Sequence, residues 1–184
     1  SERLTWHDYL ATHGIAIGTR ENQQAHLAII PPKQRTISVL QTPRGGQPTT
    51  ESHTVTFPHV LMGLRLQMGR FERAILLLPN MAQQTNMTVM SLVPTLTSFP
   101  YGNVYHGGRI CWGGVPTADI HTIRDLEDVF FTSGFNSDLF EPLSAGHAGM
   151  HAVVTNSPQG ILTPVLRNIV SVSQAISVLL GDAD

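Results

Sequence analysis

The sequence predicts an α+β fold with an antiparallel sheet, because strand-like runs come first along the chain and helical patterns come last. Short apolar runs separated by proline- and glycine-containing turns occupy much of the first hundred residues. Two later segments instead place apolar residues at helical spacing. The 184 residues are 41% hydrophobic and only 13% charged, which suits a single domain over residues 1–184 that buries a real core.

The first half of the chain is expected to hold one helix and several strands. Residues 4–11 have the apolar pattern of a short amphipathic helix that ends at His13-Gly14. Residues 60–66 and 74–78 are two strands, or a strand and a buried helix, and periodicity does not decide between these. Residues 41–52, rich in proline and glycine, are expected to form a mobile loop. Further strands are expected at 15–17, 27–30, 36–40 and 88–93.

The second half is expected to contribute helices. Residues 120–131 carry Ile123, Leu126 and Phe130 with acidic residues between them, which is typical of an amphipathic helix. Residues 163–180 also have helical spacing, with a proline suited to the first turn and Gly181 as a natural stop.

Composition excludes several classes of protein. The net charge is −2 and there is no run of basic residues, so nucleic acid is not an expected partner. No apolar stretch reaches the length of a membrane span. A single cysteine cannot form an internal disulfide, and we therefore expect a reducing compartment, the cytoplasm. The chain begins at Ser1, as in a processed product, a tag remnant or a piece of a longer protein.

The single cysteine lies in an unusual segment. Cys111 follows the glycine pair Gly107-Gly108, and Asn103 lies eight residues upstream. A thiolate accepts and releases acyl groups readily, and an amide donor can stabilise the charged tetrahedral intermediate by about 2.7–4 kcal/mol. The alternatives are that Cys111 is a small buried hydrophobic residue and that Asn103 bonds its own backbone in a turn.

Residues 99–111 resemble the active-site segment of ubiquitin-conjugating enzymes. In that family a His-Pro-Asn triplet precedes an apolar residue, a glycine turn and an Ile-Cys or Val-Cys pair. Here Tyr101, Gly102 and Asn103 occupy the triplet positions, and the spacing from the asparagine to Cys111 matches that of the family. The resemblance implies a ubiquitin-conjugating-like fold, an antiparallel meander sheet flanked by helices. It also implies that Cys111 carries a thioester and that Asn103 stabilises the oxyanion, with no cofactor.

Where the segment departs from the eukaryotic pattern, it is more similar to the bacterial branch of this family, which includes PRTRC system protein B. Tyr101 and Gly102 replace histidine and proline, and Trp112-Gly113-Gly114 replaces Leu-Asp after the cysteine. The aromatic block at residues 130–135 is similar to one in that branch, and residues 114–160 are an insertion that diverges from the family. Members are typically encoded beside a ubiquitin-like protein, an adenylating activating enzyme and a JAB-type peptidase, which are therefore the expected partners.

Four further residues are expected to flank the active site: Tyr101, His106, Trp112 and Asp119. His106 could act as a base or tune the thiol, or simply be a solvated turn residue. Asp119, Asp125 or Asp128 could orient an incoming amine, although helix solubility explains the last two equally well. Ser133 either faces the site or ends a helix, and Trp112 either packs or shields the thioester.

No metal site is predicted. His147 and His151 have the separation of helical zinc ligands, but Ala148-Gly149 lies between them and no third ligand accompanies them.

The sequence leaves three functions open. The first is an acyltransferase that carries a ubiquitin-like protein on Cys111 and transfers it to an amine. The second is a non-catalytic relative that binds a ubiquitin-like protein. The third is a cysteine hydrolase that pairs Cys111 with a distant histidine, His59, His121 or His147.

Overall fold

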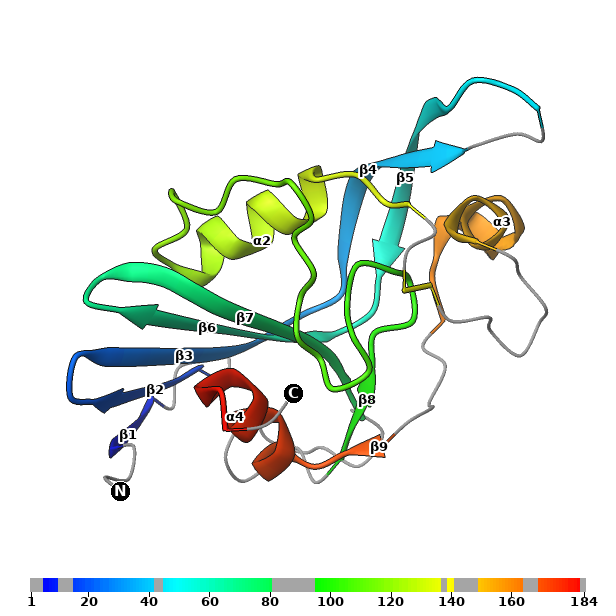
Figure 1. Cartoon of the computed structure of the whole chain (residues 1–184). Helices are drawn as coiled ribbons and strands as arrows, with labels where there is room; N and C mark the ends of the chain where they lie inside the picture. The colour runs from blue at the N-terminus through cyan, green and yellow to red at the C-terminus, as the bar shows by residue number, and fades with distance from the viewer. Residues whose placement is uncertain are drawn as a thin grey trace.

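The structure is an antiparallel α+β fold with helices on both faces of one sheet (Figure 1). This computed structural model describes residues 5–9, 15–41, 45–80, 95–136, 139–140, 149–163 and 169–182. Within these residues seven strands form the sheet, and every neighbouring pair is antiparallel. In sheet order they are β1 (Thr5–Tyr9), β2 (Ile15–Arg20), β3 (Gln23–Ile30), β6 (Val60–Gln67), β7 (Arg70–Pro79), β8 (Leu96–Ser98) and β9 (Ile169–Val170).

The central strands β6 and β7 are apolar on both faces because each face is covered. Alternate residues such as Met62, Leu64 and Leu76 point into the larger core, beneath helix α2 (Ile123–Thr132). The residues between them, such as Leu61, Ile75 and Leu77, point to the opposite face of the sheet and form a second core with helix α4 (Val172–Leu180). This two-sided burial accounts for the continuous apolar runs at 60–66 and 74–78, both of which are strands.

A two-stranded ribbon leaves the sheet between β3 and β6, so the sheet is not a simple meander. Its strands are β4 (Lys33–Gln41) and β5 (Thr49–Phe57), paired from Lys33↔Phe57 to Gln41↔Thr49. The prediction of a loop over 41–52 was wrong at its ends, because Gln41 and residues 49–52 belong to these strands. The base of the ribbon buries residues such as Val55 and Phe57 in the larger core, while its far end is exposed (Figure 1).

Helix α2 begins with a capping box and is tied to the ribbon. Thr122 accepts a hydrogen bond from the Asp125 backbone N–H, and the Asp125 carboxylate accepts one from the Thr122 backbone N–H. From the same helix Glu127 forms ion pairs with Lys33 at 3.0 Å and Arg35 at 2.7 Å, both on β4. The helix predicted at 120–131 is therefore confirmed with slightly later bounds.

The C-terminal helix is shorter than the predicted 163–180. Ile169–Val170 forms β9, and α4 begins only at Val172, after the cap residue Ser171. Gly181 ends the helix with a φ of 80°, as expected. The side chains of Arg65 on β6 and Arg73 on β7 donate hydrogen bonds to the carbonyls of Leu180 and Val178. These carbonyls lie in the last turn of the helix, where they have no backbone partner within it. The described residues also form α3 (Met150–Asn156) and the 3₁₀ turn η2 (Pro158–Gly160).

The helix predicted at 4–11 was wrong, because Thr5–Tyr9 forms the edge strand β1 against β2. A helix of eight residues has little stability alone, whereas pairing with β2 gives this segment ladder hydrogen bonds along one side. The strand predicted at 88–93 lies outside the described residues. In the described part of the chain, no helix has the length and apolar character needed to cross a membrane.

Candidate functional site

The single cysteine ends a tight hairpin that begins at Asn103. The Cys111 backbone N–H donates to the Asn103 carbonyl at 2.8 Å, and Val104 pairs with Ile110. The turn is closed where the Tyr105 N–H donates to the Arg109 carbonyl at 2.9 Å. The predicted turn at the glycine pair is therefore present, and it brings Asn103 and Cys111 side by side.

This hairpin is fixed against the edge of β7. The Leu76 N–H donates to the Gly108 carbonyl at 2.8 Å, and the Ile110 N–H donates to the Ala74 carbonyl at 2.9 Å. Gly108 has a φ of 102°, and a Cβ there would lie 2.8 Å from the Leu77 side chain. Only glycine suits this position, because it supplies both the left-handed backbone and the close approach.

An open pocket lies beside the hairpin, with Cys111 and Asn103 both in its wall. Its volume is about 80 Å³, and Cys111 is half-buried. The lining is mixed polar and apolar: Asn103, Cys111, Trp112, Gly113, Val115, Phe130, Ser133, Gly134, Asn136 and Leu139. The thiol is thus neither sealed in the core nor simply displayed on the surface.

Asn103 connects the hairpin to the segment that follows α2. Its side-chain N–H donates to the Gly134 carbonyl at 3.0 Å. That segment is held in turn by Phe135, whose backbone pairs with Ser38 and Leu40 of β4 at 2.7 Å each. A primary amide carries two N–H groups, and the bond to Gly134 uses one of them. Asn103 is therefore oriented by the fold, and its amide has a second N–H beyond the one that bonds to Gly134.

Tyr105, which the sequence did not single out, has its hydroxyl within hydrogen-bonding reach of the Cys111 thiol. A hydrogen bond to the Cys111 thiol and the negative charge of that thiol when ionised raise the pKa of Tyr105. The Arg109 guanidinium lies 4.3 Å over the Tyr105 ring and opposes this shift. The phenol therefore remains a hydrogen-bond donor to sulfur through neutral and mildly alkaline pH. The sequence could have indicated Tyr105 by its position, two residues after Asn103 and on the opposite side of the predicted turn from Cys111.

Aromatic side chains support the pocket from beneath. Trp112 makes edge-on contacts with Phe71 and Phe130, with ring centres 5.7 and 6.4 Å apart, and so acts as a packing residue that also lines the pocket. Tyr101 is fully buried against Phe57 and Phe99, and its hydroxyl donates to the Thr163 carbonyl at 3.3 Å. Burial raises the pKa of Tyr101 far above its ordinary value. Tyr101 thus packs behind the site.

Two other predicted flanking residues lie outside the pocket wall. His106 is exposed at the turn, and Asp119 is exposed in the turn before α2. Asp125 caps α2 instead of facing the pocket, and Asp128 is exposed on that helix. Ser133 has both of its predicted roles. It lines the pocket, and it ends α2, where its hydroxyl donates to the Phe130 carbonyl at 2.6 Å.

The histidines proposed as distant partners of the thiol are not in this pocket. Among the described residues that line it, none is a histidine. His59 is half-buried, where desolvation lowers its pKa, and His121 is exposed beside the start of α2. His147 lies outside the described residues. The described geometry therefore gives no support to a thiol–histidine pair.

Comparison with protein-family models, with curated proteins and with solved structures finds no match for this chain.

Proposed function

We propose that this protein is an acyltransferase of the ubiquitin-conjugating type, which carries a ubiquitin-like protein as a thioester on Cys111. The single observation that carries the proposal is the placement of Cys111 and Asn103 in the wall of one open pocket, joined by a backbone hydrogen bond of 2.8 Å. The resemblance of residues 99–111 to the active-site segment of that family supports it independently. The proposal includes an adenylating activating enzyme and a JAB-type peptidase as partners in a reducing compartment.

The proposed reaction is two acyl transfers. The Cys111 thiolate attacks the thioester carbonyl that links the modifier to its activating enzyme, so a new C–S bond forms and the enzyme's thiolate leaves. An acceptor amine then attacks the Cys111 thioester, an amide bond forms, and the Cys111 thiolate leaves while the amine gives a proton to solvent. In both steps the second N–H of Asn103 is the proposed donor to the oxyanion.

The surroundings of the thiol suit this cycle. The Tyr105 hydroxyl lies within hydrogen-bonding reach of the sulfur, so it can orient the sulfur and stabilise the negative charge on it when the thiolate leaves. The pocket is small and open, so an extended peptide tail fits it better than a bulky folded segment. A histidine is not required, because the attacking and leaving groups are both thiolates in the first step.

A second candidate is a non-catalytic relative that binds a ubiquitin-like protein without forming a bond to it. The bond from Asn103 to Gly134 favours this alternative, because it gives the amide a structural task that needs no chemistry. The two candidates differ in whether a covalent adduct forms.

The test is a loading reaction with ATP, a ubiquitin-like protein and its adenylating activating enzyme, read on a non-reducing gel. We expect an adduct on the wild-type chain that thiols release. Cys111→Ser should give an oxyester that resists thiols and is cleaved by alkali, and Cys111→Ala should give no adduct. An unchanged adduct on Cys111→Ala contradicts the proposal, and stable binding without any adduct supports the non-catalytic relative.

Asn103 is tested by discharge of the loaded protein to an added amine. The residue has a φ of 65°, which alanine tolerates poorly, so Asn103→Gly is the cleaner variant because it keeps the backbone and removes the amide. We expect loading to be slower but still to occur, and discharge to slow by about 10²-fold, the effect typical of losing one oxyanion donor. Asn103→Asp, which tolerates this backbone but has no N–H, should behave similarly. Discharge at the wild-type rate in both variants would remove Asn103 from the chemistry.

A further inference from the structure

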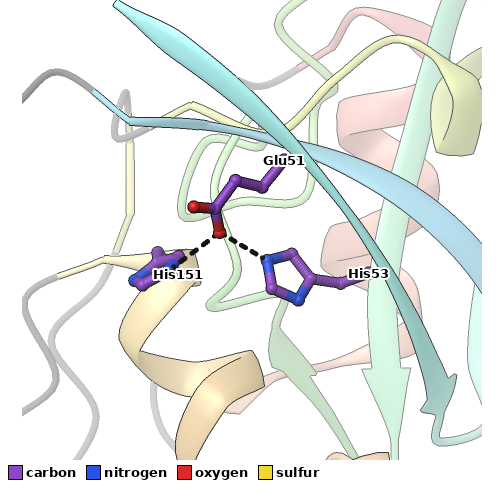
Figure 2. Close-up of side chains that lie close together, drawn as sticks. All are labelled: Glu51, His53 and His151. Carbon is purple, nitrogen blue, oxygen red and sulfur yellow. Dashed lines mark hydrogen bonds and ion pairs between the residues drawn. The ribbon is translucent and has the colours of Figure 1, made fainter.

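The ribbon and helix α3 bring together three side chains of the kinds that bind transition metals. Glu51 and His53 lie two residues apart on β5, so their side chains leave the same face of the strand. His151 comes from the first turn of α3 and faces them (Figure 2). We infer that Glu51, His53 and His151 form a binding site for a divalent transition-metal ion such as Zn²⁺.

The distances between the ligand atoms are close to those that such an ion needs. One carboxylate oxygen of Glu51 lies 3.1 Å from Nε2 of His53 and 3.1 Å from Nε2 of His151 (Figure 2). All three ligand atoms lie within 4.8 Å of one another. Two ligand atoms bound at about 2.1 Å in tetrahedral geometry are roughly 3.4 Å apart. An ion therefore requires only that the two imidazoles turn slightly toward each other.

The donor set defines the class of metal. Two imidazole nitrogens and one carboxylate oxygen suit Zn²⁺, Co²⁺ and Ni²⁺ better than Ca²⁺ or Mg²⁺, which prefer all-oxygen sites. The three side chains are 46, 22 and 35% exposed for Glu51, His53 and His151, so an ion can enter from solvent and keep water as its fourth ligand. Each imidazole would exchange its Nε2–H···O hydrogen bond for a bond from Nε2 to the metal, with its remaining proton on Nδ1.

The position of the site predicts what the ion does. Glu51 and His53 lie toward the exposed end of the ribbon, while His151 lies in the first turn of α3, ninety-eight residues after His53. The two rings already meet edge-on, with centres 5.7 Å apart. A shared ion would cross-link the ribbon to α3 and stabilise the folded chain, because the site is not assembled in the unfolded chain.

The alternative is that these residues form only an exposed ion pair between the glutamate and protonated histidines, which adds little stability. A metal titration distinguishes the metal site from the ion pair, because residues that form only an ion pair are not expected to bind one equivalent of Zn²⁺ or Co²⁺.

The experiment titrates the full chain with Zn²⁺ by calorimetry and with Co²⁺ by visible absorption. We expect one equivalent, with the d–d absorption of four-coordinate Co²⁺ and no sulfur-to-cobalt charge-transfer band. The same result in a Cys111→Ser background excludes the thiol as a ligand. At a metal concentration about a hundredfold above Kd, the midpoint of thermal unfolding should rise by roughly 5–10 °C.

Variants assign the ligands. His53→Gln and His151→Gln should each weaken binding by at least about a hundredfold, since each removes one of three protein ligands. His59→Gln, a half-buried histidine outside the cluster, is the matched control and should bind as the wild type does. Absence of stoichiometric binding, a charge-transfer band, or equal binding by both ligand variants and the control would each overturn the inference. None of these readouts depends on acyl transfer.

Discussion

At the scale of single residues, the proposed chemistry depends on Cys111 and on two polar side chains of the same hairpin, Asn103 and Tyr105. Tyr105 is 38% exposed, so its side chain is accessible to solvent on the outside of the hairpin. A hydrogen bond to a thiolate increases the fraction of thiolate but lowers its intrinsic nucleophilicity by a smaller factor. We therefore expect Tyr105 to affect the reactivity of the sulfur in the proposed reaction.

Replacing this tyrosine tests its effect on the thiol. Tyr105→Phe should slow alkylation of Cys111 by iodoacetamide about two- to fivefold at pH 7, because the thiolate loses its donor. At strongly alkaline pH the order should reverse, since the unbonded thiolate is the better nucleophile. The measurement is the alkylation rate against pH, with His106→Gln as the control in the same turn. Superimposed profiles for Tyr105→Phe and the wild type would contradict a role for the phenol.

At the scale of elements, the hairpin that ends at Cys111 depends on how closely it approaches β7. Two backbone hydrogen bonds hold it there, from Leu76 to Gly108 and from Ile110 to Ala74. The Asn103 side chain then joins it to the segment after α2. The pocket therefore forms between two elements that are each anchored to the sheet or the ribbon, which keeps its walls in place.

A pair of glycine variants tests this anchoring. Gly108→Ala should lower the free energy of unfolding by about 2–4 kcal/mol, because it combines backbone strain at φ 102° with a clash against Leu77. Gly113→Ala has a positive φ of 58° but open space around it, so strain alone should cost about 1 kcal/mol. The measurement is urea denaturation of both variants. Equal losses would mean that the contact with Leu77 is not what holds the hairpin.

At the scale of the whole molecule, the sheet separates two cores and the pocket borders the larger one. That core contains a group of aromatic residues in mutual contact, including Phe57, Phe99, Phe130 and Phe135. Tyr101 is buried among them, with its hydroxyl bonded to the Thr163 carbonyl. The same aromatic side chains therefore stabilise the larger core and support the wall of the pocket.

The buried tyrosine predicts how stability changes at alkaline pH. Burial holds the pKa of Tyr101 above the value of about 10 that it has in the unfolded chain, so the unfolded state loses the proton first. Its contribution is fully present below about pH 10, and stability should then fall by up to about 1.4 kcal/mol per pH unit as the pH rises. Tyr101→Phe should lose about 0.5–1.5 kcal/mol at neutral pH and show a shallower decline above pH 10. The measurement is urea denaturation from pH 7 to 11, and parallel curves would contradict it.

The class of the fold and the local shape of the site were predictable because they depend on short stretches of chain. Prolines and glycines bound the strand-like runs, the stop at Gly181 acts within a turn, and the glycine pair closes the hairpin between Asn103 and Cys111. Backbone preference and hydrophobic spacing operate over a few residues, and these features need nothing more distant.

Only the tertiary structure decided which distant groups meet. The apolar run at 60–66 became a strand because both its faces are covered, and residues 5–9 became a strand because β2 lies beside them. The hydrogen bond from Asn103 to Gly134 and the cluster of Glu51, His53 and His151 join segments that are far apart in the sequence. No pattern in the sequence predicts that these segments meet. Such contacts follow from the packing of whole elements, so local propensity determines the hairpin that presents the thiol, and long-range packing determines what surrounds it.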